Sequence, residues 1–318
     1  MQAITFDHGE IQFHSDYRDP RPGPDEVRVR VLQAGVCETD LQLARGYMGF
    51  SGVPGHEFVG IAQAGKFAGQ RVVGEINCNC RQCPRCQSGL GNHCDNRTVV
   101  GIDRHDGAFA QWVCIPEFNL HAVPDSISDD QAVFVEPLAA AFQIGTQVDF
   151  DRVHRAIILG DGRLGYLCAQ AIAPHVKPLD IVGKHAAKLA RFERLGLNTI
   201  ALSDLRANKD YDLVVDCTGS VSGLPLALEL TRPRGTVVLK TTVAAQHELS
   251  LAAIVIDEIQ VLGSRCGPFD QAIEALEKGW VDVSSLITNR FSLKEADHAM
   301  QVAGGPDAFK VVFDVESA

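Results

Sequence analysis

The sequence has no long apolar run, no excess of basic residues and no apolar leader. The 318-residue sequence contains no uncharged apolar stretch of roughly 20 residues, the length that spans a membrane, so no membrane partner is expected. The first residues lack a basic head followed by an apolar segment, which indicates a cytoplasmic rather than a secreted protein. The net charge of −11 also disfavours a nucleic-acid partner, because phosphates attract basic surfaces.

The length and the changing residue pattern indicate two domains. In the first part, short runs alternate polar and apolar residues between glycine, proline and aspartate turns, which is typical of β-strands. The predicted strands are Glu26–Leu32, Phe58–Ala62, Arg71–Gly74 and Gln111–Ile115. The pattern then changes, and Asp129–Val148 is predicted to form one helix with Ser128 or Asp129 as its N-cap.

From Ala156 onward, short apolar runs alternate with helical segments, which predicts a parallel sheet with helical crossovers. The predicted strands are Ala156–Leu159, Leu179–Val182, Leu213–Asp216, Thr236–Lys240 and Ile259–Gly263, and the predicted helices are Leu164–Ala173, Ala186–Leu195, Leu224–Leu230 and Phe269–Lys278. The fold class is therefore α/β, preceded by a β-rich domain. Phe309–Val315 is a further predicted strand, and its spacing leaves its partner open.

Four of the ten cysteines follow a metal-binding spacing, C-x2-C-x2-C-x7-C. They are Cys80, Cys83, Cys86 and Cys94. Four thiolates fill the tetrahedral shell of a zinc ion, so we predict a structural zinc site. The alternatives are free or disulfide-bonded cysteines, or a zinc-ribbon nucleic-acid module, which the acidic charge disfavours. Cys78 is left over and is expected to be a packed or free thiol.

Three further segments supply side chains that suit a catalytic zinc. Cys37 follows a predicted strand, and His56 and Glu57 are adjacent in the chain. Glu136 begins the run EPLAAA. Together they offer a thiolate, an imidazole and one or two carboxylates, although each alone is more often a core or surface residue. A catalytic zinc takes three protein ligands and keeps a position open for substrate.

A glycine-rich turn, GDGRLG, lies between the predicted strand Ala156–Leu159 and the helix after it. It contains Gly160, Gly162, Arg163, Leu164 and Gly165. Such glycines let the backbone approach a pyrophosphate, and the helix N-terminus stabilises the negative charge. Because a strand precedes and a helix follows, we predict a dinucleotide site rather than a chance turn. Thr218, at another strand end, is expected to lie beside the same ligand.

An NAD-selective site would carry a carboxylate about 20 residues after the glycines, and none stands there. Gly183 occupies that place, followed by Lys184 and His185. Repulsion of a 2′-phosphate is thereby reduced, and Lys184 offers a positive partner, with Lys188 on the next helix as a weaker one. We therefore expect NADP rather than NAD, unless Lys184 is only a solvated surface residue.

These motifs resemble those of the zinc-containing medium-chain alcohol dehydrogenase family, across essentially the whole chain. The matching stretches are GVCETDL, PGHEFVG, the four-cysteine pattern, EPLAAA and GDGRLG. The resemblance implies a GroES-like catalytic domain over residues 1–147, rejoined by residues 288–318. It also implies a Rossmann domain over residues 148–287, and a homodimer or homotetramer.

The resemblance further implies roles for the predicted zinc ligands. Cys37 and His56 would bind the catalytic zinc, with Glu136 as third ligand, as in polyol- and threonine-dehydrogenase-like members. Glu57 would approach the metal as ligands exchange. Asp40 would orient the zinc-bound histidine.

Thr39 and Lys310 also match residues with roles in this family. Thr39 corresponds to the hydroxyl that passes on the substrate proton, and Gln42 stands where some members complete the relay with a histidine. Lys310 corresponds to a basic residue that reaches the cofactor pyrophosphate, with a surface-facing lysine as the alternative.

The implied function is hydride transfer between a small-molecule alcohol or polyol and NADP or NAD. Two alternatives stay open: a zinc-independent quinone or enone reductase of the same fold, and a non-catalytic sensor of zinc and nucleotide. The complete set of predicted zinc ligands disfavours the first, and Thr39 disfavours the second. Primary, secondary and polyhydroxylated alcohols and threonine-like amino alcohols all remain open as substrates.

Overall fold

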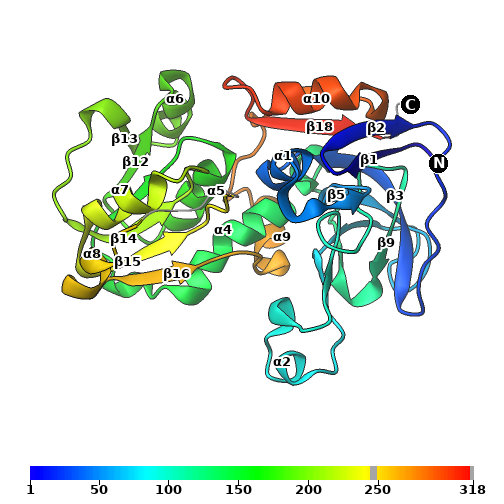
Figure 1. Cartoon of the computed structure of the whole chain (residues 1–318), viewed down its shortest axis with the longest axis horizontal. Coiled ribbons are helices and arrows are strands. Elements are labelled where there is room, and N and C mark those ends of the chain that lie inside the picture. Colours follow the sequence, from blue (N-terminus) through cyan, green and yellow to red (C-terminus); the bar gives the residue numbers. More distant parts are fainter. Residues whose placement is uncertain (244–248, 316–318) are drawn as a thin grey trace. The chain divides into compact units, whose positions relative to one another are not determined.

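The computed structural model describes residues 1–243 and 249–315, which form two compact units. Unit 1 comprises Met1–Glu136 and Phe269–Ala318, and unit 2 comprises Pro137–Pro268 (Figure 1). The domain boundaries expected after residues 147 and 287 thus fall inside unit 2 and unit 1 respectively. Among the described residues, no helix has both the length and the apolarity needed to cross a membrane.

A seven-stranded sheet lies at the centre of the described part of unit 1. Its strands, in order, are β10 (Leu120–Ala122), β6 (Arg71–Gly74), β5 (Glu57–Ala62), β3 (Glu26–Gly35), β18 (Lys310–Asp314) and β17 (Ile287–Phe291), with β9 (Trp112–Pro116) also paired to β3. β18, from the end of the chain, pairs antiparallel with β3, and Val312 lies opposite Gly35. The C-terminal segment therefore belongs to the same sheet as β5, which begins at Glu57.

Shorter elements complete unit 1. The strands are β1 (Ala3–Asp7), β2 (Glu10–His14) and β4 (Ser51–Gly52) in one sheet, and β7 (Asn77–Cys78) with β8 (Thr98–Val99) in another. The helices are α1 (Glu38–Ala44), α2 (Pro84–Gln87), α3 (Asp129–Ala132), α9 (Phe269–Glu277) and α10 (Ala296–Ala303). The first two strands and α1 were not predicted, and each spans only five to seven residues.

The single helix predicted over Asp129–Val148 is wrong. The chain forms α3 and then α4 (Val135–Gln147), and Ser128 caps α3 with a hydrogen bond accepted from the Gln131 backbone. Pro137 explains the division, since it has no N–H to continue a helix but is tolerated in the first turn of a new one. The break leaves Glu136 in the first turn of α4.

Unit 2 contains a six-stranded parallel sheet in the order β13-β12-β11-β14-β15-β16. The strands are β11 (Ala156–Leu159), β12 (Leu179–Gly183), β13 (Asn198–Ala201), β14 (Tyr211–Asp216), β15 (Thr231–Leu239) and β16 (Gln260–Gly263). The helices between them are α5 (Arg163–Ile172), α6 (Ala186–Arg194), α7 (Gly223–Leu230) and α8 (Ala252–Ile256). In sequence terms the order is 3-2-1-4-5-6, the Rossmann arrangement. The predicted fold class is confirmed.

Candidate functional site

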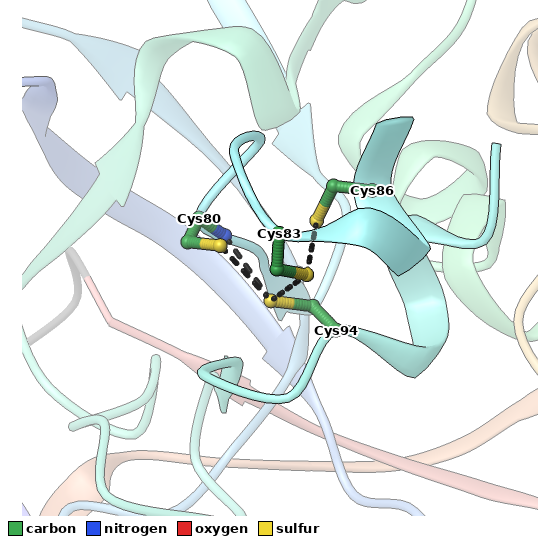
Figure 2. Close-up of side chains that lie close together, drawn as sticks. All are labelled: Cys80, Cys83, Cys86 and Cys94. Atoms are coloured by element: carbon green, nitrogen blue, oxygen red, sulfur yellow. Dashed lines mark hydrogen bonds between the residues drawn. The ribbon is translucent and has the colours of Figure 1, made fainter. Parts of the chain in front are cut away.

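The four predicted zinc cysteines come together in the loop between β7 and β8 (Figure 2). Their Sγ atoms all lie within 4.8 Å of one another. Cys83 is the N-cap of α2, and Pro84 fixes the first turn after it. Sγ of Cys83 lies 3.5 Å from that of Cys86 and 3.8 Å from that of Cys94, which lies 3.4 Å from Cys80.

This geometry suits a tetrahedral zinc ion. Zn–S bonds of about 2.3 Å place the four sulfurs about 3.8 Å apart, close to the observed distances. The backbone N–H groups of Cys80 and Asn96 donate to Sγ of Cys94, at 3.4 and 3.3 Å. Backbone hydrogen bonds from Gln82 and Cys83 lower the pKa of Cys80 to about 6, which favours the thiolate that binds metal. The donor set therefore fits a structural zinc.

A second cluster lies at the ends of β3 and β5, where Cys37, His56 and Glu57 bring a sulfur, a nitrogen and a carboxylate oxygen within 4.8 Å of one another. Cys37 is the N-cap of α1, and its backbone N–H donates to Asp40 Oδ2 at 2.8 Å. Short polar side chains at this helix start therefore hold the thiol in place. The sequence-predicted ligands Cys37, His56 and Glu57 meet in the fold.

The turn before His56 requires a glycine. Gly55 has φ +95°, and a Cβ on it would lie 2.3 Å from the Phe109 ring. The backbone N–H groups of Ala108 and Phe109 donate to the carbonyls of Gly55 and Pro54, both at 2.9 Å. This packing fixes the approach of His56 to Cys37.

His56 is buried, and its Nδ1 lies 3.4 Å from the fully buried Asp40. Burial acts most strongly and opposes a charge on the ring, but Asp40 and Cys37 together raise the pKa of His56 well above its ordinary value. A site that favours positive charge on His56 also favours a bound cation. Oε1 of Glu57 is buried without a hydrogen-bond partner, as expected of a side chain beside a metal.

The structure places Thr39 and Glu136 differently with respect to this cluster. Thr39 Oγ1 lies 3.8 Å from the Cys37 sulfur, so its hydroxyl is beside the predicted metal. Glu136, half-buried in α4, is not among the ligand atoms grouped within 4.8 Å in the described residues. A thiolate, an imidazole and a carboxylate are donors that suit a catalytic zinc, so this cluster also fits the ion.

The glycine turn of unit 2 lines a cavity of about 200 Å³. Gly160 has φ +117°, and a Cβ there would lie 2.5 Å from the Cys217 carbonyl oxygen. A Cβ on Gly165 would lie 2.2 Å from the Gly160 carbonyl oxygen, so both glycines are sterically required. Gly162 is the N-cap of α5, which begins at Arg163 and Leu164.

The cavity brings several predicted cofactor residues together. Its lining includes Gly160, Gly183, Lys184, His185 and Thr218. Lys188 lies in the first turn of α6, outside this lining. Most of the other lining residues are glycine, serine or aliphatic, and a mainly uncharged lining with a few polar groups is typical of ligand pockets.

Comparisons with known proteins agree with this geometry. Residues 23–125 match the family described as the alcohol dehydrogenase GroES-like domain. Sorbitol dehydrogenase of Halalkalibacterium halodurans is 27% identical over 98% of each chain, and L-threonine 3-dehydrogenase of Chelativorans sp. is 27% identical over 93% of each. A solved zinc-binding dehydrogenase of Sinorhizobium meliloti 1021, bound to NADP, has a TM-score of 0.88 at 27% identity, covering 99% of both chains.

These similarities support the zinc-containing medium-chain alcohol dehydrogenase family for this chain. Lys310, expected to contact the cofactor pyrophosphate, has partners within unit 1. The side chain is fully buried, forms an ion pair with Glu57 and donates to the Val36 carbonyl at 3.4 Å. To reach a phosphate, its ammonium would have to leave Glu57. Burial, opposed by Cys37 and Asp40, lowers the pKa of Lys310 to about 8.

Sequence reasoning also missed Asp161 of this dehydrogenase. It lies between the first two glycines, and its carboxylate accepts hydrogen bonds from the backbone N–H groups of Lys184 and His185. A signal was present, because a carboxylate inside a phosphate-binding turn places negative charge beside a negatively charged ligand.

Proposed function

We propose that the protein oxidises a secondary alcohol or polyol, or reduces the matching carbonyl, with a nicotinamide cofactor. The observation that carries this proposal is the cluster of half-buried Cys37 with buried His56 and Glu57, in a chain that also contains the glycine-lined cavity of unit 2. Relatives are named for sorbitol, a polyol, and for the 3-position of threonine, which carries a secondary alcohol, and these names support this substrate class.

The side chains of the cluster divide the work of such a reaction. A zinc ion bound by Cys37 and His56, with Glu136 or Glu57 as a further ligand, would polarise the alcohol oxygen, and the nicotinamide would accept the hydride. Thr39 is placed to take the alcohol proton, because its hydroxyl lies beside the Cys37 sulfur. Asp40 Oδ1 lies 3.4 Å from Nδ1 of His56, so this ring nitrogen faces the carboxylate and the other one is left for the metal.

The cofactor is NADP or NAD. The absence of a side chain at Gly183 and the charge of Lys184 support NADP. Both residues line the cavity in unit 2. Asp161 lines the same cavity, and its negative charge also affects the choice between NADP and NAD.

We further propose a homodimer formed through unit 2. β16 is an edge strand of the described parallel sheet, and an edge strand offers unpaired backbone groups to a second copy. The segment before it exposes Leu251, Val255 and Ile256, at 63%, 74% and 78%. Three apolar side chains this exposed are typical of a covered interface.

The first test is initial rates of nicotinamide reduction over sorbitol-like polyols, simple secondary alcohols and threonine, with NADP and with NAD. Chelator-sensitive turnover that Cys37→Ser abolishes would support the zinc enzyme. Chelator-resistant reduction of enones or quinones would contradict it. Tight nucleotide binding without turnover on any substrate would instead favour a sensor.

A further inference from the structure

Asp161 occupies the space that a side chain at position 183 would need. A Cβ on Gly183 would lie 2.5 Å from both Cβ and Oδ2 of Asp161. Gly183 stands where an NAD-selective site carries its carboxylate, at the end of β12. The end of β12 therefore lacks a carboxylate of its own, but the carboxylate of Asp161, from the glycine turn, lies against it. Gly183 leaves the space for that carboxylate.

The Asp161 carboxylate is held firmly in this position. Its Oδ2 accepts from the backbone N–H of Lys184 at 2.8 Å and of His185 at 2.7 Å. His185 Nδ1 lies 3.1 Å from the same oxygen and 3.2 Å from Oδ1. The residue is only 8% exposed, yet it lines the cavity beside Gly183. The two backbone N–H groups just before α6, which could otherwise bind a phosphate, thus already donate to Asp161.

We propose that Asp161 shifts the cofactor selectivity of this protein toward an unphosphorylated ribose and away from a 2′-phosphate, an inference that rests on the proposed function. Its Oδ1 lies 3.2 Å from His185 Nδ1, whereas both backbone N–H groups donate to Oδ2, so Oδ1 offers an acceptor to a ribose hydroxyl. A 2′-phosphate in the same cavity would meet a fixed negative charge and two N–H groups that are already taken. Lys184 acts in the opposite direction, and Asp161 offsets it.

The test is direct titration of the purified protein with NADPH and with NADH, followed by nucleotide fluorescence, with no alcohol present. In Asp161→Asn, the ratio of NADPH affinity to NADH affinity rises on the order of tenfold over wild type, because one charge is lost at nearly constant shape. Asp161→Ser, which also releases at least one of the two N–H groups, shifts the ratio in the same direction. Asp151→Asn is the matched control, since it removes an exposed carboxylate of unit 2 outside the cavity, and it leaves the ratio unchanged.

Each result has a definite meaning. A ratio that stays constant or falls in both folded Asp161 variants, as checked by their melting temperatures, overturns the inference and leaves Asp161 as a brace of the Lys184–His185 turn. Wild-type protein that binds neither dinucleotide overturns the proposed function, and this inference with it. Dinucleotide binding with an unchanged ratio leaves the proposed function standing alone.

Discussion

Gly35 and Lys310 share one space in unit 1. A Cβ on Gly35 would lie 2.5 Å from Cε and 2.7 Å from Nζ of Lys310, and 3.0 Å from Oε2 of Glu57. Gly35 ends β3 and lies opposite both Glu57 of β5 and Val312 of β18. The missing side chain of Gly35 thus lets a buried ion pair cross between the two neighbouring strands.

Gly35→Ala should destabilise the protein by about 1–3 kcal/mol, because Lys310 is enclosed and cannot move aside without leaving Glu57. The free energy of unfolding in denaturant measures this. Gly304→Ala is the control, since Gly304 has φ −79° and a Cβ there would approach no atom closer than 3.6 Å. Equal losses in the two variants would show that the space is not shared.

Thr39→Val should lower kcat by about 10²–10⁴, because the hydroxyl beside the Cys37 sulfur is lost as proton acceptor. Affinity for the dinucleotide should not change, since the cavity of unit 2 lacks this residue. Steady-state rates combined with nucleotide titration separate the two quantities. Thr39→Ser keeps the hydroxyl and should retain most of the rate. A valine variant with wild-type turnover would exclude Thr39 from proton transfer.

Cys94→Ser should remove zinc from the cysteine lobe, the loop that carries the four clustered cysteines of residues 80–94, and should leave zinc at Cys37 in place. The Cys94 sulfur lies 3.4 Å from that of Cys80 and 3.8 Å from that of Cys83, so its loss opens the tetrahedron. Zinc content by atomic emission, measured beside the melting temperature, checks this. Cys78→Ser is the matched control, because Cys78 lies in β7 outside the group of four. If Cys78→Ser also lost zinc, the loss in Cys94→Ser would reflect unfolding of the lobe and not the removal of a zinc ligand.

His121 should stabilise the fold mainly at mildly acidic pH. Its two ring nitrogens lie 3.0 Å from Glu75 and 2.9 Å from Asp270. Burial lowers the pKa of His121, but Glu75 and Asp270 outweigh it and raise the pKa above its ordinary value. The stabilisation is therefore complete below the unfolded pKa near 6.5, as long as the carboxylates stay ionised, and is lost as pH rises through the folded pKa.

His121→Gln should accordingly cost about 1 kcal/mol near pH 5.5 and less near pH 8.5. Urea unfolding of both proteins across this range gives the difference at each pH. A difference that grows with pH would mean that the ring binds these carboxylates in its neutral form.

Ile256→Asp should shift the protein toward monomers, because a charge replaces an apolar side chain that is 78% exposed beside β16. Light scattering after gel filtration measures the mass. Trp280→Asp is the control, since Trp280 is 64% exposed but lies in unit 1. A wild-type protein that is already monomeric would refute the proposed dimer.

Features set by neighbouring residues were predictable from the sequence. The strand Ala156–Leu159 was predicted with its observed bounds, because four apolar residues between turn signals are buried on both faces. The cysteine lobe is similarly local, with all its ligands between Cys80 and Cys94. The break between α3 and α4 was missed, although Pro137 marks it.

Features set by distant residues were not predictable. Lys310 and Glu57 are 253 positions apart, and the residue pattern does not show that the lysine points into the core, into the space that Gly35 leaves open. Asp161 and Lys184 are 23 positions apart, and the carboxylate reaches the strand end only because Gly183 has no Cβ. Both relationships depend on an empty space, and a sequence does not show which glycine provides it.

The return of β18 to β3 also orders events during synthesis. Unit 2 is one uninterrupted stretch, so every residue it needs has left the ribosome before residues 310–314 are made. Until β18 is made, unit 1 lacks the strand that pairs with this side of β3, and Glu57 lacks its ion-pair partner Lys310. Unit 2 can therefore mature first, and the sheet of unit 1 is completed last.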